Sequence, residues 1–144
     1  MKLLLTVALG ALALSGGPPQ VVARTTAGET VAQLTLPASR TFALEYRHSY
    51  YRRPARETFR ARADGAFELV AISSPSEAVL DYYEIEGVRE RRNGRWTLRP
   101  AHPARFDSMA LAATRVGRRT LVAGGVKVPL YAAGDVHLRL VVER

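Results

Sequence analysis

Short runs of apolar and β-branched residues recur along this chain, and polar turn residues separate them. After Pro19 no run keeps apolar residues at helical spacing over three turns, whereas alternation with a period of two is frequent. This pattern predicts an all-β fold, a single antiparallel β-sandwich or partly open β-barrel with at most one short helical turn, which Ser74 or Ser76 can cap. The predicted strands span residues 20–25, 30–36, 41–48, 56–63, 67–72, 82–92, 95–99, 108–116, 120–123, 126–130 and 136–142.

The clearest turn signal is Asn93-Gly94, which lies between two of these strands. Asn-Gly favours a two-residue hairpin, because both central positions need positive φ. The resulting register places Arg91 opposite Trp96, where the guanidinium and the indole can form a cation–π pair.

The N-terminus has a different character. The stretch "MKLLLTVALGALALSGG" carries a lysine, an apolar run from Leu3 to Leu14 and then small residues. That run is too short for a bilayer, which takes about 20 residues, and the stretch has the form of a secretory signal peptide. We expect residues 1–15 to be removed, with cleavage after Ala23 or an uncleaved anchor as alternatives. The rest, residues 20–144, is then one exported domain with no transmembrane span, extracellular, periplasmic or attached to the cell envelope.

The amino-acid composition limits which kinds of site and partner this chain can have. The chain has no cysteine, which excludes disulfides, thiolate metal sites and a cysteine nucleophile. No metal site or other cofactor is predicted. The formal charge of +8 favours an acidic partner. However, 19 of the 21 basic residues are arginine, a ratio that favours the base composition of a genome over a binding surface as the explanation of this charge.

The stretch "YRHSYYRRPARETF" concentrates the candidate chemistry. In the preceding strand His48 continues the apolar face, and in the following strand Glu57 points to the same side. A hairpin that places Tyr46 opposite Phe59 also places His48 opposite Glu57. We therefore expect these two side chains to pair, which would raise the pKa of His48. The pair is either structural or an acid–base pair.

Other residues of this stretch are candidates for binding. A serine nucleophile is not favoured, because Ser49 points away from its neighbour His48 if the strand continues. The candidate binding residues are Tyr46, His48, Ser49, Tyr50, Tyr51 and Glu57. A solvent-facing ladder of Arg56, Arg60 and Arg62 is a candidate for an anionic partner, although it could equally protect a sheet edge from aggregation. Export argues against nucleic acid as that partner.

The same stretch resembles a known family. The spacing F-x-L-x-Y-x-H-S, then Pro54 and E-T-F, is similar to the signature of the bacterial and archaeal family described as domain of unknown function 1850. Later segments near "RFDSMALAATRVGRRTL" and "GDVHLRLVV" are similar to its C-terminal strands. The chain departs from the family at "SPSEAVLDYY", where members often carry a Gly-Ala-Gly-Leu-Pro-like stretch. Members are typically short and exported, and some are encoded near tripartite periplasmic transporters with TAXI-type binding proteins. The resemblance implies an accessory or binding role near transport.

Three hypotheses remain open from the sequence. The first is an exported accessory or binding module whose partner is a transporter component, a small molecule or an anionic envelope polymer. The second is a small exported enzyme that uses His48 and Glu57. In the third, Tyr50, Tyr51 and the neighbouring arginines form a loop that contacts another protein.

Overall fold

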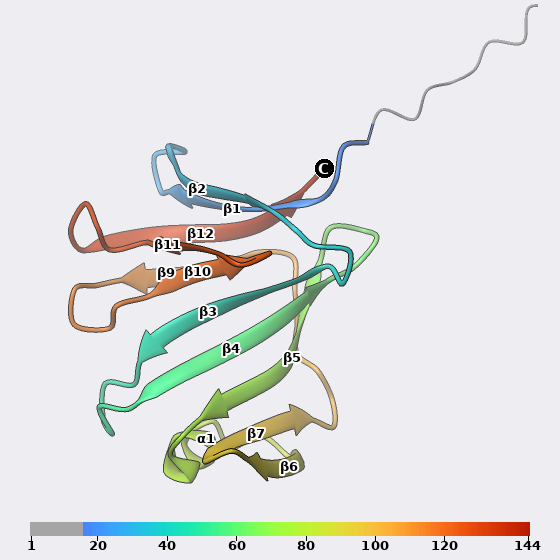
Figure 1. Cartoon of the computed structure of the whole chain (residues 1–144). Coiled ribbons are helices and arrows are strands. Elements are labelled where there is room, and N and C mark those ends of the chain that lie inside the picture. The colour runs from blue at the N-terminus through green and yellow to red at the C-terminus, as the bar shows by residue number, and fades with distance from the viewer. Residues whose placement is uncertain (1–15) are drawn as a thin grey trace, which may run out of the picture.

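The computed structural model describes residues 16–144, which form antiparallel strands and one short helix (Figure 1). The all-β prediction is confirmed, whereas the predicted leader, residues 1–15, lies outside the described residues. Within residues 16–144, no helix has both the length and the apolar character needed to cross a membrane. The elements are β1 (Gln20–Thr25), β2 (Thr30–Thr35), β3 (Thr41–Arg47), β4 (Pro54–Ala61), β5 (Phe67–Ser74), α1 (Glu77–Tyr82), β6 (Gly87–Arg92), β7 (Arg95–Pro100), β8 (Arg105–Phe106), β9 (Met109–Ala113), β10 (Thr120–Ala123), β11 (Val126–Pro129) and β12 (Val136–Glu143).

The strands form two sheets that pack face to face around one core. The smaller sheet has the order β2-β1-β12-β9, and the larger has the order β11-β10-β3-β4-β5-β7-β6, with β8 beside β5. Val21 and Leu140 of the smaller sheet join Leu44 and Leu121 of the larger one in a single buried cluster. Two antiparallel sheets around one core fit the predicted β-sandwich or partly open β-barrel.

Aromatic rings fill the centre of that core. Phe42 and Phe59 stack with their ring centroids 5.2 Å apart, and Phe67 meets both of them edge-on. Phe42 and Phe59 are also cross-strand partners on β3 and β4. Such pairs stabilise a sheet beyond the area they bury. They therefore help to fix the register of the two strands that carry the candidate site.

Helix α1 is the predicted helical turn, and it packs against β5 and β7 through the buried Val79 and Leu80 (Figure 1). Ser76 stands at the N-cap position, but its side chain makes no capping hydrogen bond. The Ser74 hydroxyl instead accepts a bond from the Ser76 backbone N–H and donates one to the carbonyl of Pro54. The start of α1 is thereby tied to the start of β4.

The hairpin predicted at Asn93-Gly94 is confirmed. Both residues have positive φ, 50° and 73°. Arg91 and Trp96 are cross-strand partners, and the guanidinium carbon of Arg91 lies 5.7 Å from the centroid of the indole ring. The local turn chemistry therefore determines the register of β6 and β7.

The predicted register of β3 and β4 is wrong. Glu57 lies opposite Leu44, and Phe59 lies opposite Phe42, a displacement of four residues from the expected pairing. An even displacement leaves every side chain on its expected face, so alternation cannot distinguish the two registers. The structure adopts the register with the shorter connection between β3 and β4. In it His48 lies beyond the end of β3, and a turn over residues 48–53 leads directly into β4.

Candidate functional site

His48 is buried at the start of the turn between β3 and β4, with 4% of its surface exposed. Its Nδ1 accepts a hydrogen bond of 3.3 Å from the backbone N–H of Tyr51. The rings of Tyr82 and Tyr51 lie 4.6 and 5.3 Å from the imidazole, centroid to centroid. Burial among these rings lowers the pKa of His48, because it disfavours the charged imidazolium. The expected rise of this pKa is therefore contradicted.

Glu57 has a different partner from the one predicted. Its Oε1 accepts a hydrogen bond of 2.6 Å from the hydroxyl of Tyr83, which follows α1. The Tyr83 hydroxyl is also hydrogen-bonded to that of Tyr46 on β3. Since an ionised carboxylate only accepts, Tyr83 donates to Glu57 and Tyr46 donates to Tyr83. The result is a chain of three side chains that joins β3, β4 and the end of the helix.

Burial strongly affects the pKa values of Tyr46 and Tyr83, the two phenols of this hydrogen-bond chain. Burial, aided by the nearby charge of Glu57, raises the pKa of Tyr46 to about 12, against the lowering influence of Tyr83 and Arg119. Burial and the same carboxylate also raise the pKa of Tyr83. Both tyrosines are therefore protonated near neutral pH, as donation along the chain requires.

His48 and Glu57 do not form the predicted acid–base pair. Among the hydrogen bonds and ion pairs of residues 16–144, none joins His48 to Glu57, and none joins the exposed Ser49 to His48. The predicted binding residues separate into two groups. Tyr46 and Glu57 belong to the hydrogen-bond chain, whereas His48, Ser49, Tyr50 and Tyr51 belong to the turn. No group of three or more acidic, histidine or cysteine side chains comes together in the described part of the chain.

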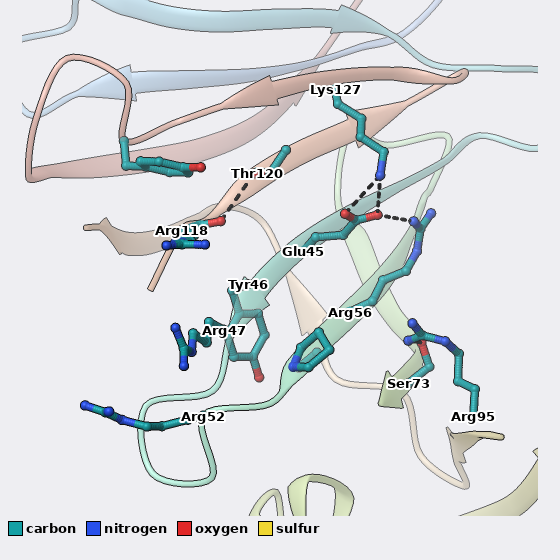
Figure 2. Close-up of a pocket in the computed structure, with 13 residues that line it drawn as sticks. Glu45, Tyr46, Arg47, Arg52, Arg56, Ser73, Arg95, Arg118, Thr120 and Lys127 are labelled. Atoms are coloured by element: carbon teal, nitrogen blue, oxygen red, sulfur yellow. Dashed lines mark hydrogen bonds and ion pairs between the residues drawn. The ribbon is translucent and has the colours of Figure 1, made fainter. Parts of the chain in front are cut away.

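A basic groove lies on the outer face of the larger sheet (Figure 2). Its volume is about 750 Å³. The cationic side chains that line it are Arg47, Arg52, Arg56, Arg95, Arg118 and Lys127. Glu45 is the one carboxylate among the lining residues, and Tyr46, Pro54, Ala55, Ser73, Thr120 and Tyr131 complete the lining.

Sheet order explains how residues from distant segments reach this groove. Glu45 on β3 lies opposite Arg56 on β4 and Thr120 on β10, and Arg56 lies opposite Ser73 on β5. Directly paired residues project from the same face of a sheet. Their neighbours Leu44 and Leu121 point the other way, into the core. The outer face thus collects polar side chains from successive strands.

Two of the groove arginines have an unusual backbone conformation. Arg52 and Arg118 have φ values of 53° and 52°, in the left-handed region that disfavours side chains with a Cβ. Each lies in a turn, where its backbone N–H bonds to the carbonyl of His48 or Thr114, respectively. Glycine would adopt these conformations without strain. Arg40 and Glu84 have similar φ values, 58° and 53°, outside the groove, so this conformation by itself does not mark the groove.

Positive charge dominates the groove. The Glu45 carboxylate lies between Arg56, at 2.7 Å, and Lys127, at 3.1 Å (Figure 2). Within the described part of the chain, Arg47, Arg52 and Arg118 have no carboxylate partner within 4.0 Å. Arg95 also has no carboxylate partner among the described residues, and it bonds the hydroxyl of Ser73 instead. One acidic group is therefore set against six cations, and four of those cations have no carboxylate partner that would compete with a ligand.

The predicted arginine ladder is only partly in this groove. Arg56 lines it, but Arg60 and Arg62 do not, and Arg62 lies 3.8 Å from Glu68. The remaining groove cations come from separate turns and strands that no spacing rule links. The sequence signal that could have found some of them is the clustering of arginine beside turns, as in "YYRRP" and "VGRRT".

No protein-family model matches this chain, and neither a curated protein nor a solved structure matches it. The resemblance to the family of domain of unknown function 1850 therefore stays a prediction.

Proposed function

We propose that this chain is an exported binding module, rather than an enzyme, and that it holds an anionic ligand in the basic groove. The observation that carries this proposal is the set of six cationic side chains around one carboxylate in a single cavity. Arginine supports it further, because a guanidinium presents a planar fork that bonds carboxylate or phosphate with two parallel hydrogen bonds.

The arrangement around His48 favours binding over catalysis. A general base must reach the proton it removes, and His48 is buried with its Nδ1 occupied by a backbone N–H. Glu57 is occupied by Tyr83. Both residues instead support the turn and the strands that position the groove.

Export is part of the proposal because of the leader pattern in residues 1–15. Cleavage after residue 15 is favoured over cleavage after Ala23, since β1 lies between β2 and β12 and the later cut would remove most of it. Protein recovered outside the cytoplasm should begin near Gly16. Intact Met1 in a cytosolic pool would count against export. The family resemblance adds a possible partner, a transporter that this chain would assist. Transporter genes beside the gene for this chain would support that role, and their absence would count against it.

The groove can be tested with a labelled oligoglutamate as the probe. Arg52→Gln with Arg118→Gln removes two charges from the groove, and Arg60→Gln with Arg62→Gln removes two charges outside it. We expect the groove variant to bind roughly tenfold more weakly or worse, because hydrogen bonds to charged groups contribute about 1.5–3 kcal/mol each. The control variant should bind nearly as well as the parent. Equal weakening of both would mean that binding follows net charge, and the groove would not be the site.

A further inference from the structure

A second cavity lies on the outer face of the smaller sheet, on the opposite side of the core from the basic groove. Its volume is about 560 Å³. Sites for small molecules in proteins commonly have volumes of about 300–1,000 Å³. Its lining comes from β1, β9 and β12 and from the turn after β1. Because Leu138 and Leu140 of β12 point into the core, their neighbours His137, Arg139 and Val141 project from the cavity side of the sheet.

The strand pairing separates this cavity into a cationic part and an apolar part. Arg139 on β12 lies between Arg24 on β1 and Ala110 on β9, in one row across the sheet. In the row that contains His137, its partner on β9 is Ala112. Directly paired residues project from the same face. Both alanines are exposed and short, so β9 forms a low apolar floor beside the longer side chains of β12.

The cationic part has one positive charge without an anionic partner. Arg24 and Arg139 lie directly opposite each other, a placement in which like charges repel. Glu143 compensates Arg24, since its Oε2 accepts a bond of 2.9 Å from Nη2 of Arg24. Arg139 instead donates a bond of 3.2 Å to the hydroxyl of Ser108. Within residues 16–144, no carboxylate lies within 4.0 Å of the Arg139 guanidinium.

We propose that this cavity is a second binding site, and that it takes a small monocarboxylate with an apolar body. The carboxylate meets the planar fork of Arg139, which can form two parallel hydrogen bonds with it. The exposed ring of His137, two positions away on the same face, offers a further hydrogen-bond donor. One unpartnered guanidinium matches one carboxylate, whereas the six cations of the basic groove match a polyanion.

The apolar part of the lining favours an organic acid over an inorganic anion. Ala110 and Ala112 are exposed to water, and Val141 is half-buried. A ligand with an apolar body removes this surface from water, which is favourable in proportion to the area covered. Phosphate or acetate at Arg139 would leave most of this surface in water.

Three probes separate the charge from the apolar body. 2-Naphthoate has both, 2-naphthamide has the body without the charge, and acetate has the charge with almost no body. We expect 2-naphthoate to bind most tightly in NMR titrations of the isotope-labelled protein. The amide signals that move should belong to β1, β9 and β12. The site is independent of the basic groove, so oligoglutamate should not displace 2-naphthoate.

Two pairs of variants test the two parts of the site. Arg139→Gln should weaken 2-naphthoate binding at least tenfold, because it removes a hydrogen bond between charged groups. Arg60→Gln makes the same change at an exposed position on β4, outside the cavity, and should leave binding unchanged. Val141→Thr should weaken binding roughly fourfold, since about one buried methyl group is lost. Its matched control is Val31→Thr on β2, also outside the cavity.

Several results would overturn this inference. One is the absence of 2-naphthoate binding to the parent protein, and another is equal binding of 2-naphthoate and 2-naphthamide. Equal weakening by Arg139→Gln and Arg60→Gln would show that binding follows net charge. Amide shifts confined to the residues of the basic groove would place the probe there instead. None of these results bears on oligoglutamate binding to the groove, so the proposed function stands or fails separately.

Discussion

The hydroxyl of Tyr83 donates a hydrogen bond of 2.6 Å to Oε1 of Glu57, although 26 positions separate the two residues. The bond joins the C-terminal end of α1 to the inner face of β4. Through the hydroxyl of Tyr46 it extends to β3. The helix and the two strands that lead into the arginine-bearing turn are thus held by one polar chain inside an apolar environment, where each member depends on the next.

Replacing Tyr83 with phenylalanine should therefore destabilise the fold. The change leaves the partly buried carboxylate of Glu57 without its donor and the hydroxyl of Tyr46 without its acceptor, at a cost of about 1–3 kcal/mol in the free energy of unfolding. Chemical denaturation measures this difference. Tyr82→Phe is the matched control, since its ring is mostly exposed, and we expect a change within about 0.5 kcal/mol. Equal effects of the two variants would contradict the role of the chain.

Because two tyrosines belong to this hydrogen-bond chain, we expect the folded protein to lose stability at alkaline pH. Burial raises the pKa of Tyr46 to about 12 in the folded protein. The unfolded protein ionises near the ordinary value of about 10, so the stability from this group is fully present below about pH 10 and is lost as pH rises through the folded value. Denaturation curves at increasing pH should show the decline. The double variant Tyr46→Phe and Tyr83→Phe should show a smaller decline than the parent.

His48 should affect the stability of the fold at acidic rather than alkaline pH. Burial lowers its pKa, so the folded protein favours the neutral imidazole. Stability is unaffected above the ordinary value of about 6.5 and falls as pH drops through it, because the unfolded chain takes up the proton first. NMR titration of the ring protons should give a folded pKa below that value. Glu57→Gln should leave this titration nearly unchanged, whereas a large shift would restore the pairing predicted from the sequence.

Most of the fold could be predicted from the sequence because alternation and turn residues are local signals. The bounds predicted for β1 and β10 are those observed, Gln20–Thr25 and Thr120–Ala123. Residues 82–86 were expected to be strand, but α1 extends to Tyr82 and Glu84 has a φ of 53°, which delays β6 until Gly87. The strand β8 has two residues, too few for any periodic signal.

The groove could not be predicted in the same way. Its lining comes from β3, β4, β5, β7, β10 and β11 and from three turns, and only the sheet order brings these together. Alternation placed Arg56 correctly on the solvent face, but it could not show that Lys127 lies beside Glu45 in the same groove. The pairing of His48 with Glu57 failed for a related reason, since two registers four residues apart satisfy the same alternation.

The backbone of Arg52 offers a test that separates stability from binding. Its φ of 53° strains any residue with a Cβ, so Arg52→Gly should leave stability unchanged or raise it by up to about 1 kcal/mol. The same change removes a groove cation and should weaken oligoglutamate binding. Arg118→Gly should behave alike. Thermal unfolding and binding titrations on the same samples check both effects. A glycine variant that binds as well as the parent would show that the turn alone, and not the arginine, is what matters.

Glu45 provides the most direct test of the electrostatics, because its removal should strengthen binding. In the parent protein the carboxylate accepts hydrogen bonds from Arg56 and Lys127. Glu45→Gln keeps the shape and frees both cations, so we expect tighter binding of oligoglutamate and a steeper fall of affinity with added salt. The cost in stability should stay below about 1 kcal/mol, since these ion pairs are partly exposed. Glu90→Gln makes the same charge change outside the groove, at an exposed pair with Arg99, and should alter affinity much less. If Glu45→Gln weakens binding instead, then Glu45 holds Arg56 and Lys127 in the conformation that the ligand needs, and simple charge competition in the groove is excluded.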